Sequence, residues 1–225
     1  MSFRDLFLTL QNYSLKLDSY LDVYEKTFQK FKNKRPIILE IGVRGGGGIE
    51  LLHKYFNGNC EIYGVDIDER VLQINNIYPD AKIYLGDQAN KQFMKYVAEN
   101  IGKPIDIIID DGGHFMHQQI NSFEALFPYI NNDGVYLIED VSTSLQSKFN
   151  NGTTPTFIEY IHKNTIDVIN AFSCNKSMYS IEFYQEIIIV HKKPKPPFKF
   201  ISCDRVNGYK IGFKLEDSID PFQNV

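Results

Sequence analysis

The sequence predicts an α/β protein whose sheet is mostly parallel, has helices on both faces and finishes in an antiparallel hairpin. Between residues 35 and 140, five short apolar runs alternate with four stretches whose apolar residues have helical spacing. One run, "IDIIID" at 105–110, is apolar almost throughout, which is typical of a central strand buried on both faces. At 225 residues, with 43% of them hydrophobic, the chain is long enough to bury a full core.

The N-terminal residues 2–34 are predicted to form a pair of helices. Their apolar residues recur at spacings of three and four, which places them on one helical face. Ser2 and Asp5 have the spacing of a capping box. We expect this pair to pack on the main domain, because an amphipathic helix usually buries its apolar face.

The main domain is predicted as five strand and helix units. The predicted strands are "PIILEIG" (36–42), "EIYGVDI" (61–67), "AKIYLGD" (81–87), "IDIIID" (105–110) and "GVYLIED" (134–140), and the helices between them are 48–56, 69–77, 90–100 and 117–130. Such an alternation indicates a parallel sheet with helices on both faces.

The remainder of the chain completes the sheet and adds a short extension. After a loop at Asn151-Gly152, a helix is expected around residues 157–172, and "MYSIEFYQEIIIVHKK" then predicts two strands with a bend near Tyr184-Gln185. "PKPPF" ends the regular structure, and residues 198–225 are predicted as an extension with a turn at Asn207-Gly208. The expected organisation is therefore an N-terminal helical extension (1–34), a main domain (35–193) and a C-terminal extension (194–225).

Charge and cysteine usage exclude several kinds of partner. The net charge of −4 and the pI near 5.7 give no bulk attraction to nucleic acid or to an anionic membrane. Charged residues interrupt the apolar positions at the N-terminus, so neither a signal peptide nor a membrane span is expected there. The three cysteines are far apart and lack a CxxC spacing, which fits a reduced cytoplasm.

A glycine-rich loop follows the first predicted strand, in "LEIGVRGGGG". In open α/β sheets, ligands bind beyond the carboxyl ends of the strands, and glycines there let the backbone approach a ligand closely. Such a loop alone is a weak signal, but the absence of GxxxxGK[ST] disfavours a P-loop nucleoside triphosphatase. Glu40 lies too early to cap the next helix and could accept a hydrogen bond from a cationic or hydroxylated ligand group.

Acidic residues end the second and third predicted strands. Asp66 is the candidate to bind both hydroxyls of a ribose, whereas Asp68 is expected to cap the following helix. Asp87 or Gln88 could hydrogen-bond an adenine edge, although a helix cap by Asp87 has nearly equal weight.

Four carboxylates end the fourth and fifth predicted strands, which should be neighbours. Asp110 and Asp111 follow one strand, and Glu139 and Asp140 end the other. Such a cluster would repel itself and raise at least one pKa, unless a hard cation such as Mg²⁺ neutralised it. Both aspartates could simply cap the next helix, but the second acidic pair favours the functional interpretation.

His114 lies three residues after Asp111, where it could accept a proton from a substrate hydroxyl. Alone it would more often be a structural histidine, and its acidic neighbours reverse that expectation. His117 could share a helix face with His114 and form a two-histidine metal site, but a packing role is preferred.

These segments resemble a known family. "ILEIGVRGGGG", "IYGVDID", "YLGDQAN" and "IDIIIDDGGH", followed by "YLIEDVSTS", resemble the class I S-adenosylmethionine-dependent methyltransferases. Within that class the chain is most similar to the Mg-dependent sugar O-methyltransferases of macrolide antibiotic biosynthesis. The resemblance covers roughly residues 36–192 and implies a Rossmann-like class I methyltransferase fold with a seven-stranded sheet. The DDGGH and IED segments are its specific part.

The resemblance implies a role for each matching residue. The implied cofactor residues are Glu40, Gly42 and Gly45 at the methionine end, Asp66 at the ribose, and Asp87 and Gln88 at the adenine, with Asp110 also expected at the cofactor. The implied Mg²⁺ ligands are Asp111, Glu139 and Asp140, with His114 as the general base. Arg44 stands where many methyltransferases have glycine, which leaves open which glycine touches the cofactor.

The implied function is transfer of a methyl group from S-adenosylmethionine to a hydroxyl of a sugar or a similar polar acceptor, in surface polysaccharide or natural-product biosynthesis. The expected partners are that small-molecule acceptor and neither nucleic acid nor membrane, and the chain could form a homo-oligomer. Two alternatives stay open: an NAD-dependent oxidoreductase, which leaves the carboxylates unexplained, and a non-catalytic nucleoside-binding module.

Overall fold

The computed structural model describes residues 1–150, 155–169, 177–194, 199–206 and 209–217. The predicted turns at Asn151-Gly152 and Asn207-Gly208 lie outside these ranges, as does most of the "PKPPF" segment. No helix in the described part of the chain is both long and apolar enough to cross a membrane.

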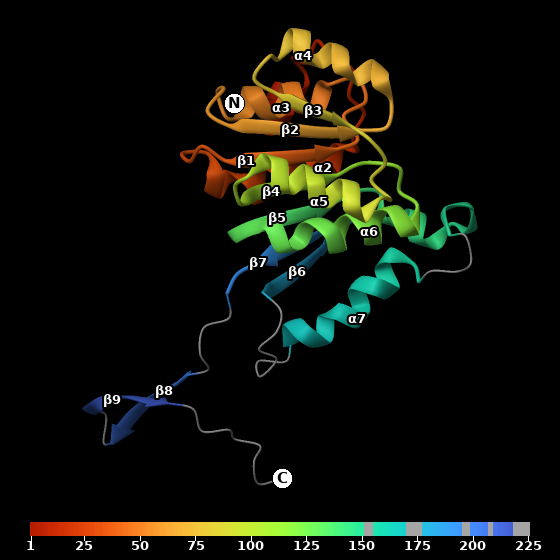
Figure 1. Cartoon of the computed structure of the whole chain (residues 1–225). Coiled ribbons are helices and arrows are strands. Elements are labelled where there is room, and N and C mark those ends of the chain that lie inside the picture. Colours follow the sequence, from red (N-terminus) through yellow and green to blue (C-terminus); the bar gives the residue numbers. More distant parts are fainter. Residues whose placement is uncertain (151–154, 170–176, 195–198, 207–208, 218–225) are drawn as a thin grey trace.

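A seven-stranded sheet forms the centre of the molecule (Figure 1). Its strands are β1 (Ile37–Ile41), β2 (Glu61–Asp66), β3 (Lys82–Leu85), β4 (Ile105–Asp110), β5 (Ile130–Ile138), β6 (Met178–Tyr184) and β7 (Ile187–Lys192). Their spatial order is β3-β2-β1-β4-β5-β7-β6, and only β7 runs antiparallel to its neighbours. This arrangement confirms the predicted mostly parallel sheet with a terminal antiparallel hairpin.

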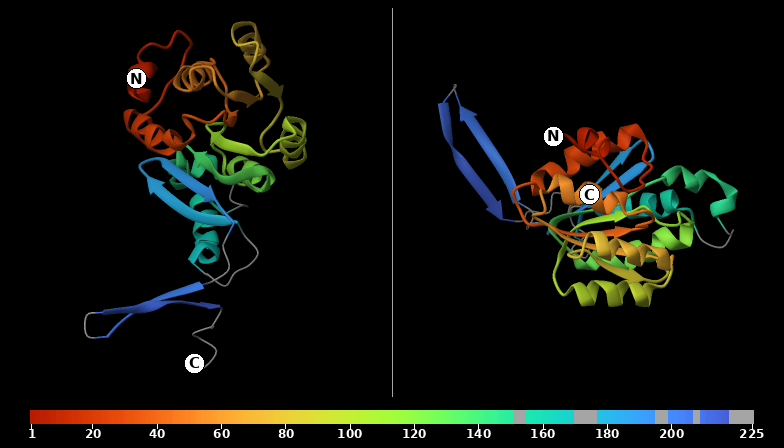
Figure 2. Two further views of the ribbon diagram at one scale, coloured as in Figure 1. Left: turned by 90° about the vertical axis from the view of Figure 1, so that its left-hand side faces the viewer. Right: turned by 90° about the horizontal axis from the view of Figure 1, so that it is seen from above.

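Helices cover both faces of the sheet, as Figure 2 shows in the view from above. They are α1 (Phe3–Phe7), α2 (Asp18–Phe28), α3 (Gly47–Tyr55), α4 (Ile74–Ile77), α5 (Lys91–Ile101), α6 (Met116–Leu126) and α7 (Phe157–Ile169). One core cluster joins the first four helices to one face, and a second joins the last three to the other. The predicted N-terminal pair therefore shares a core with the sheet, and the capping box of Ser2 and Asp5 is present.

The register of the strands brings the predicted site residues to one edge. Ile41 pairs with Val65 on one side and with Asp110 on the other, and Asp110 pairs with Ile138. The residues that follow these four strands consequently lie side by side, because parallel strands end at the same edge.

Three details differ from the sequence predictions. The fifth strand ends at Ile138, so Glu139 and Asp140 follow it, and Asp140 adopts a left-handed conformation with φ 53°. The helix expected over 69–77 is a 3₁₀ turn, η2 (Glu69–Gln73), followed by the single turn of α4. The extension after residue 194 forms an antiparallel hairpin of β8 (Lys199–Val206) and β9 (Tyr209–Asp217), which the sequence analysis did not predict.

Candidate active site

The glycine-rich loop after β1 packs between the loop that follows β4 and the N-terminal segment, defined here as residues 10–17, between α1 and α2. Gly42 has φ +89°, and a Cβ at this position would lie 2.0 Å from the carbonyl oxygen of Asp111. Further along the loop, Gly45 packs against Tyr13, and the N–H of Gly47 donates to the Tyr13 carbonyl oxygen at 3.1 Å. The glycines therefore allow two backbone segments to lie directly against the loop.

Replacing Gly42 by alanine is expected to lower the free energy of unfolding by about 2–5 kcal/mol. The added methyl group would clash with backbone, which cannot rotate away, and the positive φ adds strain. Gly102 is a matched control, because its φ is +68° but the nearest atom to an added Cβ is 3.7 Å away. Gly102→Ala should lose only about 1–2 kcal/mol in urea unfolding, and equal losses in the two variants would contradict the proposed clash.

A cavity of about 390 Å³, called here the carboxyl-end cavity, opens beside this loop. Its walls come from the ends of β1 and β2, from the loops that follow these strands and β3, β4 and β5, and from Leu15 and Gln118. Seven predicted site residues line it: Gly42, Asp66, Asp87, Gln88, Asp111, His114 and Asp140. Glu40 instead lines a small adjoining cavity, of about 30 Å³, with Lys16, Gly42 and Asp111. Gly45 faces the N-terminal segment and lines neither cavity.

Asp66 shapes the loops on either side of the carboxyl-end cavity. One carboxylate oxygen accepts from the backbone N–H of Arg44 at 2.8 Å, and the other accepts from that of Asp68 at 2.9 Å. Each oxygen keeps a free lone pair for a ligand hydroxyl. Asp68 caps the turn that follows by accepting from the backbone of Arg70, as predicted. Asp87, by contrast, does not cap α5, since Asn90 has that position.

Asp110 lies behind the cavity wall and does not line the cavity, which differs from the expectation that it contacts a cofactor. Its fully buried carboxylate accepts hydrogen bonds from Ser122 at 2.6 Å, from Tyr136 at 3.2 Å and from the amide of Gln88 at 3.0 Å. The amide oxygen of Gln88 accepts from the N–H of Gly113 at 2.8 Å. Asp110 and Gln88 thus hold the loop after β4 in place.

The acidic cluster consists of Asp111, Glu139 and Asp140, with His114 beside it. One atom from each of Asp111, His114 and Asp140 lies within 4.8 Å of the others, a spacing that could hold a metal ion. The Nε2 atom of His114 is 3.3 Å from Asp140 Oδ2 and 3.8 Å from Asp111 Oδ1. His114, Asp140 and Arg44 all have positive φ, and such strain is often found at functional sites.

Three residues that precede β1 reach the acidic cluster, one from the segment before α2 and two from α2 itself, and none of them was predicted as a site residue. Lys16 places its ammonium 2.5 Å from Asp111 Oδ2 and 2.8 Å from both carboxylate oxygens of Glu139. The hydroxyl of Tyr24 donates to Glu139, and that of Tyr20 donates to Asp140 at 2.5 Å. The only signal in the sequence was the spacing of four that puts both tyrosines on one face of α2.

The buried charges of this region do not balance. Burial raises the pKa of Glu40 to about 8, and it raises the pKa of Glu139 to about 7 against the attraction of Lys16. Burial acts to lower the pKa of Lys16, but Glu139 and Asp111 attract its charge more strongly, and that pKa is raised. A single ammonium thus faces several carboxyl groups, a setting that favours the binding of a further cation.

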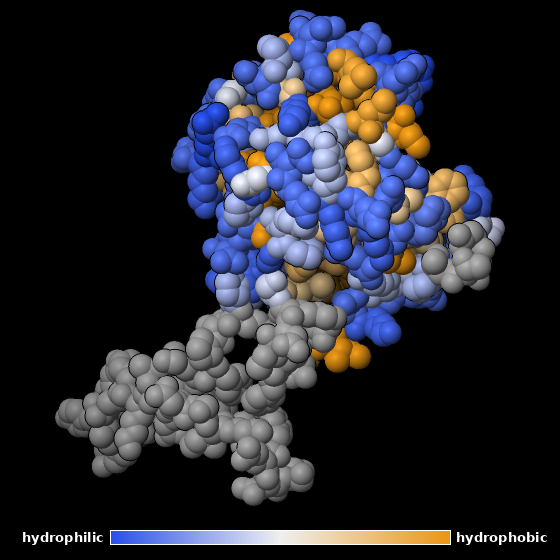
Figure 3. All heavy atoms as spheres, in the orientation of Figure 1, coloured by the Kyte–Doolittle hydropathy of each residue, from blue (hydrophilic) through white to orange (hydrophobic). Residues whose placement is uncertain are grey.

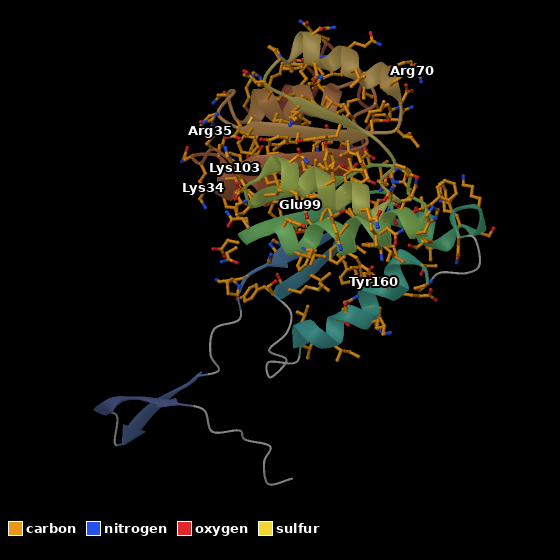
Figure 4. The ribbon with its side chains drawn as sticks, in the orientation of Figure 1. Lys34, Arg35, Arg70, Glu99, Lys103 and Tyr160 are labelled. Atoms are coloured by element: carbon orange, nitrogen blue, oxygen red, sulfur yellow. The ribbon has the colours of Figure 1, made fainter. Side chains whose placement is uncertain are left out.

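A second cavity, of about 740 Å³, lies at the opposite edge of the sheet, beside the amino ends of β2 and β3. Arg35 and Lys103 line it and form ion pairs with Glu61, at 3.7 and 3.0 Å. Figure 4 shows both basic side chains at the end away from the strand arrowheads. This cavity has no glycine-rich loop, so the predicted chemistry belongs to the carboxyl-end cavity.

Comparisons with known proteins identify relatives of this arrangement. No family model matches the sequence. A tetracenomycin-C rhamnosyl 2'-O-methyltransferase of Streptomyces olivaceus is 33% identical over 140 residues, which cover 59% of this chain and 36% of that protein. The mycinamicin VI 2''-O-methyltransferase of Micromonospora griseorubida is 35% identical over 142 residues, covering 59% and 34% of the two chains. The chain thus spans about a third of the length of these curated relatives.

Solved structures show the same fold. The MycE methyltransferase of the mycinamycin pathway, in complex with Mg and SAH, aligns with a TM-score of 0.71 and 27% identity over 81% of this chain and 52% of its own. A putative caffeoyl-CoA O-methyltransferase from Staphylococcus aureus aligns with a TM-score of 0.53 at 15% identity, over 80% and 85% of the two chains, which supports the fold alone.

The mostly parallel seven-stranded sheet with its terminal antiparallel hairpin matches the Rossmann-like methyltransferase fold of the MycE structure, as the sequence resemblance implied. The curated homologues of the chain are sugar O-methyltransferases of macrolide and tetracenomycin biosynthesis.

Proposed function

We propose that the chain transfers a methyl group from S-adenosylmethionine to a hydroxyl of a sugar, with the help of a divalent cation such as Mg²⁺. One observation carries this proposal: a single cavity connects the glycine loop and Asp66 to Asp111, His114 and Asp140. A cofactor bound along the loop would present its reactive end beside the acidic cluster. The MycE structure holds Mg and SAH, the form of the cofactor that remains after the methyl group has left, and thereby supports both ligands.

The residues that line the cavities fit S-adenosylmethionine. We assign the ribose hydroxyls to Asp66 and the adenine to Asp87. Gln88 would form the cavity wall beside the adenine. Glu40 is buried and has one carboxylate oxygen without a hydrogen-bond partner in the described part of the chain. That oxygen is available to a positively charged amino group, so we assign the methionine end to Glu40 and Gly42. Gly45 contacts Tyr13 and lines neither cavity, so we assign it an indirect role, in positioning the segment before α2 beside the cofactor.

The acidic cluster fits a hard divalent cation, because its donors are carboxylate oxygens. Asp111, Glu139 and Asp140 would hold the ion, and the tyrosine hydroxyls on Glu139 and Asp140 would orient two of the three carboxylates. When bound, S-adenosylmethionine would supply a methyl group on a sulfonium, and the cation would lower the pKa of an acceptor hydroxyl. His114 faces the cluster through Nε2 and would accept the proton of that hydroxyl there.

The proposed acceptor is a sugar carried on a partly apolar molecule. The curated relatives are named for sugar positions on tetracenomycin and mycinamicin. Leu15 and Ile67 line the carboxyl-end cavity, and each is 71% exposed. Figure 3 shows apolar atoms gathered beside the ends of β2 and β3, where an apolar part of the acceptor could lie. The cytoplasmic location stays a prediction from the cysteine pattern.

Calorimetric titration separates the proposed function from the two alternatives. We expect the protein to bind S-adenosylmethionine and not NAD, whereas an oxidoreductase would show the opposite preference. Incubation with S-adenosylmethionine, Mg²⁺ and an α-L-rhamnosyl acceptor should add one methyl group, detected by mass spectrometry. Tight binding of S-adenosylmethionine without transfer to any of a panel of glycosides would instead favour a non-catalytic binding module.

Removal of divalent cations with EDTA is expected to lower the rate of methyl transfer about tenfold or more. Binding of S-adenosylmethionine should change little, because the residues assigned to its ribose and adenine lie outside the acidic cluster. Added Mg²⁺ should restore the rate. Full turnover by EDTA-treated protein would rule out the cation from the reaction and leave the methyl transfer itself intact.

A further inference from the structure

We infer that Lys16 is a resident counter-cation of the acidic cluster, which a divalent cation has to displace in order to bind. In this inference, the ammonium and the metal ion occupy Asp111 and Glu139 in alternation. It rests on the proposed function, since that function supplies the divalent cation, and it adds a determinant of metal affinity in the N-terminal segment.

The contacts of Lys16 are those of a cation in a ligand site. Its ammonium lies within 2.8 Å of three carboxylate oxygens, from residues 95 and 123 positions further along the chain. The side chain is only 4% exposed, and that of Glu139 is 1% exposed. An ammonium brought so far out of water is stabilised only by such close pairing.

The ammonium and Tyr24 leave Glu139 a single free acceptor position, on Oε2. Both of its oxygens accept from Lys16, and Oε1 also accepts from Tyr24. Mg²⁺ binds carboxylate oxygens at about 2.0–2.1 Å. Because the ammonium is 2.8 Å from Oε2, an ion bound to that oxygen would lie at most about 5 Å from the ammonium. Two positive charges at that separation repel strongly in a buried site.

Lys16 belongs to a segment that could release it without unfolding a helix. Residues 10–17 have no helical or strand structure. On one side this segment is held by Glu50, which accepts from the backbone of Gln11 and Asn12 at 2.8–3.1 Å, and by the N–H of Gly47, which donates to the Tyr13 carbonyl oxygen at 3.1 Å. On the other side it enters α2 at Asp18. Only the stretch between these attachments needs to rearrange.

A competing arrangement leaves Lys16 in place. The metal ion would then bind Asp111, His114 and Asp140, each of which has a ligand atom within 4.8 Å of those of the others, and Glu139 would never be a ligand. The two arrangements differ in what the loss of the ammonium does. If the metal ion displaces Lys16, the loss frees Asp111 and Glu139 as ligands. If the metal ion binds beside Lys16, the loss removes only a nearby positive charge.

Binding of Mn²⁺ alone, followed by electron paramagnetic resonance, measures how strongly the Lys16 ammonium opposes the metal ion. Lys16→Met keeps the length of the side chain without its charge and should bind Mn²⁺ between about 5- and 150-fold more tightly than the unmodified protein. Lys54→Met is the control, because Lys54 pairs with Glu50 at 2.7 Å and also contacts Thr9, outside the acidic cluster. It should leave the affinity unchanged. A similar gain in both variants, or a gain below threefold in Lys16→Met, overturns the inference.

Chemical labelling of lysines tests displacement in the unmodified protein, even if Lys16→Met does not fold. An acetylating reagent should label Lys16 slowly without metal and at least fivefold faster at saturating Mn²⁺, whereas labelling of Lys54 should stay constant. Continued protection of Lys16 when Mn²⁺ is bound overturns the inference but leaves the proposed methyl transfer untouched. Failure of every variant to bind Mn²⁺ overturns both the inference and the metal-assisted part of the proposed function.

Discussion

Replacing His114 by glutamine is expected to lower kcat for methyl transfer by about 10²–10⁴-fold, the usual contribution of a general base. The imidazole Nε2 faces Asp140 and Asp111, where the acceptor hydroxyl would be held. Glutamine fills similar space but cannot take the proton. The dissociation constant of S-adenosylmethionine should stay within about threefold of the unmodified value, because the loss concerns proton transfer and not cofactor binding.

His117 provides the matched control for this variant. It lies three residues further on, in the first turn of α6, and its ring contacts Phe115 and not the acidic cluster. His117→Gln should retain kcat within about threefold. If His114→Gln also lost more than tenfold in affinity for Mn²⁺, His114 would be a metal ligand and the assignment as base would be wrong. If kcat did not fall, no proton transfer through His114 would limit the reaction.

Much of the fold was accessible from the sequence because the central strands carry short runs of buried apolar residues. The buried run of β4 and the alternation with helical stretches are local patterns, and they predicted the parallel sheet. The C-terminal hairpin was missed although a signal was present. Asn207-Gly208 lies between two runs that alternate apolar and polar residues, which is a typical hairpin pattern.

The candidate site was predicted only where strand geometry alone decides the position. Asp111 and His114 follow β4, and the edge of a parallel sheet brought them to the cavity as expected. The position of the Asp110 side chain was harder to predict. Successive side chains of a strand point to opposite faces, and this alternation could have shown that Asp110 and Asp111 point in different directions. The Asp110 carboxylate points to Ser122 on α6, whereas that of Asp111 faces the N-terminal segment.

Lys16 could not have been placed from the sequence by any local rule. It lies in a segment without periodic structure, and its partners are far along the chain. A lysine in such a segment is normally solvated. Its burial follows from the tertiary contact of Tyr13 with the glycine loop and from the attachment of Gln11 and Asn12 to Glu50.

Replacing Glu40 by glutamine is expected to raise the stability of the cofactor-free protein at alkaline pH. Burial raises the pKa of Glu40 from 4.5 to about 8 in the folded state, so the folded protein keeps a proton that the unfolded chain loses. Stability therefore falls as the pH rises between these two values, by up to about 5 kcal/mol once Glu40 is ionised. In urea unfolding, the free energy of unfolding of Glu40→Gln should exceed that of the unmodified protein by about 2–5 kcal/mol near pH 9. Near pH 4 the two free energies should be equal.

Glu50 is a second buried glutamate, and its replacement by glutamine is expected to lower the stability instead of raising it. Glu50→Gln therefore serves as the control for Glu40→Gln. Although burial acts to raise its pKa, hydrogen bonds from Lys54 and from the backbone of Asn12 and Gln11 hold it below the ordinary value. Glu50→Gln should thus lower the free energy of unfolding by about 1–3 kcal/mol at neutral pH. This loss should fade as the pH falls through the lowered pKa of Glu50. If both variants were destabilised near pH 9, Glu40 would be a structural carboxylate. If Glu40→Gln gained stability and bound S-adenosylmethionine about tenfold more weakly, the buried charge would be retained for the cofactor at the expense of the fold.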